Sequence, residues 1–117
     1  MRVLIGYEVS HRSYGETAAG AISWLRPGVE VSLVRAAELG GEVARLVPHL
    51  VVCNRSNSVD PGGRVAWARL STEPDEPSEF CLDGRRRSLT NPDFEELLAI
   101  VDEAEELVRG GQELGGC

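Results

Sequence analysis

Two short and almost wholly apolar runs in the first half of the chain constrain its fold more than any other feature. Residues 3–7 read VLIGY and residues 50–53 read LVVC, so neither run alternates with polar positions. A strand that is buried on both faces has this composition, and such strands are typical of parallel sheets with helices on both sides. We therefore expect both runs to be central strands of a parallel sheet.

The residues between the two runs have the periods of a helix, a strand and a second helix. Apolar residues recur at helical spacing through residues 18–25, after Ser13 and Glu16 at the spacing of a capping box. Residues 29–33 alternate apolar and polar positions, which places this strand at a sheet edge. Residues 39–47 have a second helical stripe. The first 53 residues therefore predict the order β-α-β-α-β.

The second half predicts mostly β structure. Residues 54–64 have no apolar period and contain Pro-Gly-Gly, so we expect a polar loop, followed by a strand at 65–70. The pair Asp83-Gly84 predicts the turn of a hairpin at 79–89, with a single strand and a loop as the alternative.

A long amphipathic helix with an acidic outer face follows. Asn91 has the residue type of an N-cap, Pro92 fits the first helical position, and apolar residues recur from Phe94 to Val108. We expect residues 110–117 to be a flexible tail.

The charge balance excludes several classes of function. The chain has 19 acids and 12 bases, and its net charge of −7 repels phosphate backbones and anionic membranes. We expect no nucleic-acid partner and no membrane partner. All 12 bases are arginine, so a Walker phosphate loop and a lysine Schiff base are excluded. No apolar run is long enough for a signal peptide or a membrane span, and we expect a cytoplasmic protein.

The three cysteines, Cys53, Cys81 and Cys117, match neither a C-x-x-C motif nor the spacing of a zinc site. We expect free thiols packed in the interior, and neither a metal nor a cofactor. The two tryptophans, Trp24 and Trp67, fit core positions better than a binding surface.

Two segments of the first half resemble the receiver domains of bacterial two-component response regulators. Residues 2–5 (RVLI) lead into Tyr7 and Glu8, where that family has a pair of metal-binding acids. Residues 48–54 (PHLVVCN) resemble its third strand, which ends in the phosphoacceptor aspartate. The resemblance covers residues 2–57.

The resemblance implies an α/β fold with a three-layer, flavodoxin/receiver-like open sheet. Its N-terminal half would be β-α-β-α-β, its second half mostly β, and a helix would close the chain. Residues 1–109 would form this single receiver-like domain, and residues 110–117 the flexible tail.

The positions that carry the family's chemistry depart from its pattern. Glu8 is the only acid of the pair, Asn54 stands at the phosphoacceptor position, and a chain without lysine cannot supply the family's lysine. Phosphotransfer needs metal, carboxylate and cation together. We therefore expect no catalytic residue. The first hypothesis is a non-catalytic, receiver-like signalling or interaction module.

A second hypothesis concerns the carboxyl ends of the strands, where ligands bind in open α/β sheets. Polar residues follow the first and third predicted strands, and two arginines and a helix N-terminus there would favour an anion. The protein would then be a small-anion or metabolite-binding protein, or an enzyme. The candidate ligand-binding residues are Glu8, His11, Arg12, Asn54, Arg55, Ser56 and Asn57.

The run Arg85, Arg86 and Arg87 is the candidate interface. It lies in the predicted hairpin, whose outer strand leaves a sheet edge, while the last helix is rich in acids. A two-fold axis would bring this helix of one protomer to the arginines of the other and make the contact twice. We expect a homodimer, together with a protein partner that the sequence does not identify.

Acetyl phosphate with Mg²⁺ should leave the protein unmodified, because the Asn54 amide cannot form an acyl phosphate and no lysine balances the phosphoryl charge. Intact mass spectrometry measures the outcome, with a receiver domain that retains its aspartate as the positive control. A stoichiometric, base-labile phosphate adduct on this chain would contradict the prediction.

Overall fold

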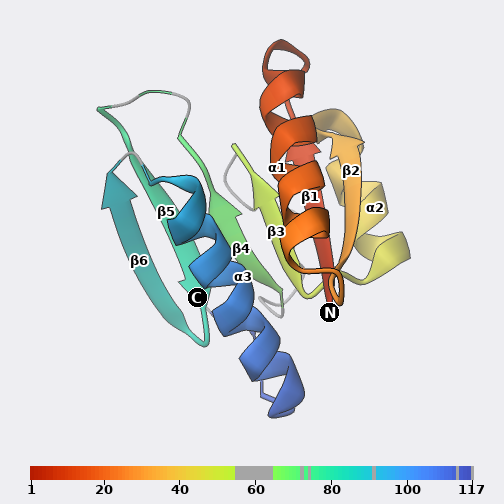
Figure 1. Cartoon of the computed structure of the whole chain (residues 1–117), viewed down its shortest axis with the longest axis vertical. Helices are drawn as coiled ribbons and strands as arrows, with labels where there is room; N and C mark the ends of the chain where they lie inside the picture. Colours follow the sequence, from red (N-terminus) through yellow and green to blue (C-terminus); the bar gives the residue numbers. More distant parts are fainter. Residues whose placement is uncertain (55–64, 72, 74, 91, 113, 117) are drawn as a thin grey trace.

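The computed structural model describes residues 1–54, 65–71, 73, 75–90, 92–112 and 114–116. Short 3₁₀ helices, η1 (Val9–His11) and η2 (Ala36–Glu38), lead into the first two α-helices. The strands and α-helices along the chain are β1 (Arg2–Tyr7), α1 (Arg12–Leu25), β2 (Glu30–Arg35), α2 (Leu39–Leu46), β3 (Leu50–Cys53), β4 (Ala66–Arg69), β5 (Pro77–Leu82), β6 (Arg85–Thr90) and α3 (Phe94–Arg109) (Figure 1).

These strands form one mixed, six-stranded sheet in the order β2-β1-β3-β4-β5-β6. β2, β1, β3 and β4 are parallel, and β5 and β6 join them antiparallel. The α/β class, the β-α-β-α-β first half and the edge position of β2 are confirmed. The flavodoxin-like arrangement is not confirmed, because two antiparallel strands extend the sheet beyond β4.

The hairpin of β5 and β6 follows from its two-residue turn. Asp83 has a φ of 54° and Gly84 a φ of 72°, and a type I′ turn needs positive φ at both central positions. Aspartate tolerates this conformation and glycine adopts it freely. A turn this short joins only antiparallel strands. The hairpin, rather than a single strand and a loop, is therefore confirmed.

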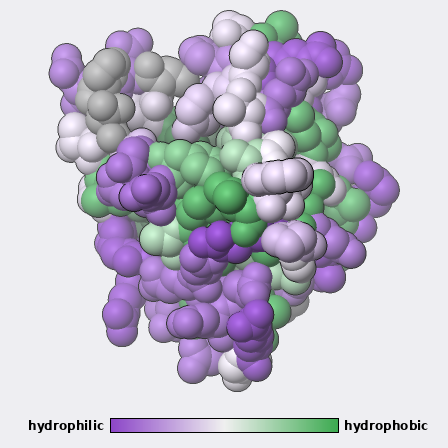
Figure 2. Space-filling view, viewed as in Figure 1, coloured by the Kyte–Doolittle hydropathy of each residue, from purple (hydrophilic) through white to green (hydrophobic). Residues whose placement is uncertain are grey.

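Helices cover both faces of the sheet around β1 and β3 (Figure 1). On one face Ile22 of α1 and Val101 of α3 belong to the same buried cluster. On the other face Leu39 of α2 packs with Leu4 and Val51. This two-sided burial explains why the two central runs contain almost no polar residues. The surface over α3 is largely hydrophilic, in keeping with its acidic outer face (Figure 2).

Two helices begin at residues other than those predicted. α1 has His11 at its N-cap without a side-chain cap bond, and Ser13 lies inside the helix because η1 already turns the chain. In α3 the N-cap is Asp93, whose side chain accepts a hydrogen bond from the Glu96 N–H at 2.8 Å. The Asp93 N–H donates to the Glu96 carboxylate at 3.3 Å. This reciprocal capping box starts α3 after the predicted cap, Asn91, which lies outside the described residues.

The core position predicted for Trp24 is wrong, because 84% of the residue is exposed. Ile22 is fully buried, and a residue two positions further along a helix is rotated by about 200°. Trp24 therefore points away from the sheet. Trp67 is partly buried, and the guanidinium of Arg86 lies over its ring at 5.3 Å from the centroid.

The expectation of free thiols is wrong for Cys81, which is disulfide-bonded. Cys53 forms no disulfide and is buried at the end of β3, as expected. The spacing of cysteines along the sequence does not reveal which of them the fold brings together. The sequence therefore did not predict the disulfide of Cys81.

Part of the segment that was expected to be a flexible tail packs onto the fold. Leu114 is 7% exposed and belongs to the core cluster on the α1 and α3 face. The N–H groups of Asp83 and Gly84 donate to the carbonyls of Leu114 and Gly115, both at 2.7 Å. A buried leucine and backbone hydrogen bonds therefore hold this segment against the β5–β6 turn.

The candidate interface lies in β6, at the edge of the sheet. Arg87 pairs with Glu103 of α3 at 2.8 Å, and Arg86 lies 3.6 Å from Glu79 and over Trp67. The contact between arginine and acidic helix that we expected between protomers is therefore made within one chain by Arg87. The homodimer stays a prediction.

The glycines of α1 give a matched test of how closely this helix packs. A Cβ at Gly15 would lie 2.9 Å from the Tyr7 Cβ, whereas a Cβ at Gly20 would meet nothing within 4 Å. Gly15→Ala should lower the free energy of unfolding by about 1–3 kcal/mol through overpacking. Gly20→Ala should raise it by up to about 1 kcal/mol through helix propensity. Urea unfolding measures both, and two equally stabilised variants would contradict the close contact.

His49, just before β3, predicts a loss of stability in mild acid. The Arg2 N–H donates to its Nδ1 at 3.0 Å, which requires an unprotonated nitrogen. Burial, then the charges of Arg2 and the N-terminal amine, lower the pKa of His49 below its ordinary value. The unfolded chain therefore binds the proton more tightly than the folded chain. This contribution is complete above about pH 6.5 and is lost as the pH falls through the lowered, folded-state pKa.

Urea unfolding at a series of pH values from neutral downward tests this behaviour of His49. His49→Asn keeps an acceptor near the Nδ1 position and does not titrate. The wild-type curve should fall below about pH 6.5 relative to the variant. Parallel pH curves for the two proteins would show that His49 makes no such contribution.

Candidate functional site

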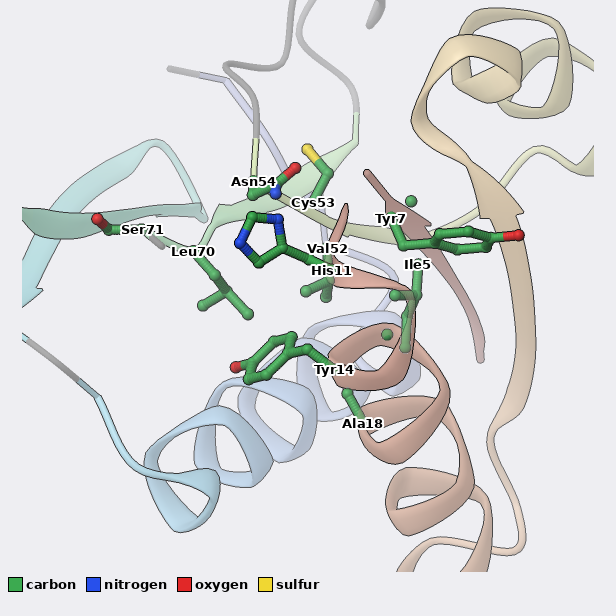
Figure 3. Close-up of a pocket in the computed structure, with 12 residues that line it drawn as sticks. Ile5, Tyr7, His11, Tyr14, Ala18, Val52, Cys53, Asn54, Leu70 and Ser71 are labelled. Carbon is green, nitrogen blue, oxygen red and sulfur yellow. The ribbon is translucent and has the colours of Figure 1, made fainter. Parts of the chain in front are cut away.

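A cavity of about 200 Å³ opens at the carboxyl ends of β1, β3 and β4, beside the first turn of α1 (Figure 3). Parallel strands end at the same edge of a sheet, so the residues that follow them meet there. The described residues that line it are Ile5, Gly6, Tyr7, His11, Tyr14, Gly15, Ala18, Val52, Cys53, Asn54, Leu70 and Ser71.

The floor of the cavity depends on the close approach of α1 to β1. Gly15 faces the Cβ of Tyr7 at a distance that leaves no room for a side chain. Figure 3 shows the ring of Tyr7 directed away from His11. Tyr7 therefore lines the cavity with the part of its side chain near the backbone and not with its hydroxyl. Gly15 thereby brings the first turn of α1 next to the strand ends.

The walls of the cavity are mainly apolar. Ile5, Val52 and Ala18 are buried and come from β1, β3 and α1, and Leu70 follows β4. No Asp, Glu or Arg belongs to the lining as far as the structure describes it. In such a low-dielectric space a hydrogen bond is strong, and an unpaired charge is costly.

Asn54 lines the cavity and has an unpaired acceptor. Its Oδ1 is buried and has no hydrogen-bond partner. A buried carbonyl without a donor is destabilising by about 1–3 kcal/mol, and native structures contain few of them. Figure 3 shows the nitrogen of the Asn54 amide toward the ring of His11 and its oxygen on the far side of the amide.

His11 reaches into the middle of the cavity from the N-cap of α1 (Figure 3). Its Nδ1 lies 3.0 Å from the hydroxyl oxygen of Ser10. Serine both donates and accepts, so Nε2 is a donor in one tautomer and an acceptor in the other. The Nε2 of His11 can therefore pair with a hydrogen-bond donor or with an acceptor.

Tyr14, Cys53 and Ser71 complete the polar part of the lining. The ring of Tyr14 lies across from Asn54, with His11 between them (Figure 3). Partial burial raises the pKa of the Tyr14 phenol, so the hydroxyl keeps its proton at neutral pH. Cys53 forms no disulfide; it lies at the end of β3 and is 3% exposed.

The structure brings together only part of the predicted crevice. His11 and Asn54 line the cavity, whereas Arg12 is directed to Glu16, with 2.7 Å between its Nε and the carboxylate. Glu8 is not in the lining, and its carbonyl accepts from the His11 N–H at 2.8 Å. The remaining predicted residues, Arg55, Ser56 and Asn57, lie outside the described part of the chain.

Sequence reasoning missed Tyr14, Cys53, Leu70 and Ser71 as lining residues. Tyr14 could have been predicted, since it follows His11 by three positions and shares its helix face. Leu70 and Ser71 directly follow β4, whereas the crevice was predicted only from the residues after the first and third strands.

No protein-family model matches this chain, and no curated protein or solved structure shows significant similarity to it. Within the described ranges there is no group of three or more His, Cys, Asp or Glu that would hold a metal ion. The helices described here include none that is long and apolar enough to cross a membrane.

Proposed function

We propose that this protein is a binding module for a small molecule, held in the cavity at the carboxyl ends of β1, β3 and β4. The observation that carries the proposal is the cavity itself, which has apolar walls and the side chains of His11, Tyr14 and Asn54 in its lining. Ligand sites are typically concave and mostly apolar, with a few polar groups that orient the ligand.

The position of the cavity in the sheet supports this proposal. The chain leaves β1 through α1 to β2 on one side and later returns through α2 to β3 on the other. The two crossovers lie on opposite faces, so the strand order reverses at β1. Ligands of open α/β sheets bind outside the carboxyl ends of the strands at such a point.

The described lining favours binding without chemistry. A general base of the histidine type is oriented by a third group, commonly a carboxylate, and acts on a nucleophile within hydrogen-bond reach. His11 has the hydroxyl of Ser10 at its Nδ1, and the described lining residues include no carboxylate. We therefore place the protein among binding modules rather than enzymes.

The receiver-like signalling or interaction module remains a hypothesis beside this one. Asn54 stands where the resembling family has its phosphoacceptor, and it also lines the cavity. A ligand at this position would give such a module an input that does not depend on phosphorylation. The two hypotheses are compatible in this form.

The test replaces Asn54 with leucine, which has a similar shape and no polar atoms. In the free protein, Asn54→Leu should raise the free energy of unfolding by about 1–2 kcal/mol, because it removes an unsatisfied buried acceptor. Ser78→Ala is the matched control: Ser78 is 1% exposed, and its hydroxyl accepts from the Ser71 N–H at 2.9 Å. The control should lose about 1–3 kcal/mol.

Binding is measured by NMR with a set of small neutral compounds and ¹⁵N-labelled protein. Compounds that bind should shift the amide signals of His11, Tyr14 and Asn54 in the wild type, and the shifts of His11 and Tyr14 should change in Asn54→Leu, which removes a polar group from the lining. A wild-type spectrum that no compound perturbs at these positions would overturn the proposal. An Asn54→Leu variant that is destabilised like Ser78→Ala would contradict the unpaired state of the Asn54 oxygen.

A further inference from the structure

Strand β6 leaves one edge of the sheet open, and its residues define the kind of segment that fits there. We propose that this edge is a docking site for an extended segment of another protein, which adds to the sheet antiparallel to β6 and alternates acidic with apolar residues. The site shares no described lining residue with the cavity, so this inference does not depend on the proposed function.

The edge position of β6 supplies the hydrogen bonds of such a site. β6 is last in the strand order, and within the described part of the chain its one neighbour is β5 (Figure 1). All residues of the strand, Arg85–Thr90, are exposed. An edge strand presents N–H and C=O groups to which the backbone of another chain can pair.

The register of the hairpin shows which backbone groups of β6 point outward. Leu82 and Arg85 flank a two-residue turn and therefore form a hydrogen-bonded pair. Such pairs alternate with non-hydrogen-bonded pairs in an antiparallel ladder. Pro77, which has no N–H, lies opposite Thr90 at a non-hydrogen-bonded position, as the alternation requires. The outward N–H and C=O groups are therefore those of Arg86, Ser88 and Thr90.

On the α3 face of the sheet, β6 borders an apolar groove. Phe80 of β5 belongs to the same buried cluster as Val101 of α3, and the register places Leu89 on this face. A groove of about 300 Å³ lies there, with apolar walls from Phe80, Leu89 and Ile100. Leu89 is 36% exposed. Apolar side chains of an added strand would pack beside the groove and cover this leucine.

On the opposite face, Arg86 favours an acidic residue. Its Nε lies 3.6 Å from a carboxylate oxygen of Glu79, and its side chain is 65% exposed. Charge-assisted hydrogen bonds are shorter, about 2.7–2.9 Å. Glu79 is also shared with Arg69, at 3.4 Å. Ser88 and Thr90 lie on the Arg86 face, and their hydroxyls can donate to carboxylates. Acids at every second position of an added strand therefore have partners on this face.

The charges of the edge favour an acidic segment over a second copy of this chain. Antiparallel pairing of β6 with itself would bring Arg85, Arg86 and Arg87 of both copies to one interface. Like charges on an edge strand oppose edge-to-edge pairing of identical chains. An acidic segment has the opposite sign, so the same arginines attract it and orient it.

The probe is a blocked peptide of alternating glutamate and valine, about eight residues long, which spans β6. In antiparallel pairing the glutamates lie opposite Arg86, Ser88 and Thr90, so their N–H groups face β6 and those of the valines face away. Methylation of every glutamate nitrogen should therefore abolish binding, and methylation of every valine nitrogen should leave the affinity within about threefold. A peptide with lysine in place of glutamate should bind about tenfold more weakly.

Amide hydrogen exchange of ¹⁵N-labelled protein measures the pairing residue by residue. When the peptide occupies about nine-tenths of the protein, exchange at Arg86, Ser88 and Thr90 should slow about tenfold, because only the free fraction exchanges. Exchange at Arg87 and Leu89 should change much less, because their N–H groups already bond to β5.

Ser88→Pro tests the backbone of the edge. It removes one outward N–H and leaves the ladder with β5 intact, because proline is tolerated on edge strands where the N–H faces solvent. The variant should lose peptide binding, while the amide signals of β1 and β3 stay those of the wild type.

Arg86→Gln tests the charge of the edge. It should weaken binding of the peptide by about two- to fivefold, the size of one cross-strand ion pair. Arg45→Gln is the matched control, because Arg45 is an exposed arginine of α2, paired with Glu42, and its loss changes the net charge equally. This control should bind the peptide like the wild type.

Other results overturn the proposal or part of it. Equal binding of the two methylated peptides would reject strand addition and leave attraction between charges. Binding of the glutamate-methylated peptide alone would reject the antiparallel direction in favour of a parallel one. Slow exchange at Arg86, Ser88 and Thr90 in the free protein, with the mass of a dimer in light scattering, would show that a second copy covers the edge. Exchange that no concentration of the peptide slows would reject β6 as its docking site.

Discussion

The burial of β1 and β3 on both faces is the constraint on which the rest of the structure depends. Strands without a solvent face must be covered twice, so the crossovers through α1 and α2 lie on opposite sides of the sheet. Parallel pairing follows from these helical connections, and it places the carboxyl ends of β1, β3 and β4 at one edge. The cavity exists because those ends meet there.

The cavity combines a tightly packed floor with an unsatisfied polar group. Gly15 allows α1 to approach Tyr7 so closely that no side chain fits between them, while Asn54 keeps a buried oxygen without a donor. The first feature stabilises the fold through packing, and the second opposes folding by about 1–3 kcal/mol.

The sequence by itself determined the order and type of the elements. The periods of residues 3–53 correspond to β1, α1, β2, α2 and β3 in turn, and the Asp83-Gly84 pair corresponds to the observed hairpin turn. Such signals are local: periodicity tells which side of its own element a residue occupies, and turn chemistry follows from the φ values that a residue tolerates. Part of the site could be predicted in the same way, since Asn54 directly follows a predicted strand and His11 lies four residues after another.

Only the tertiary structure decided which elements and side chains meet. Arg12 was expected at the crevice, but a carboxylate one helical turn away, on Glu16, binds its guanidinium. Leu114 lies in the core because the β5–β6 turn presents free N–H groups to the carbonyls beside it. Trp24 is exposed because the sheet lies on the Ile22 side of α1. Each outcome depends on contacts between residues far apart in the chain or on competition between nearby partners. The residues next to a position in the sequence determine neither which of these contacts form nor how strong they are.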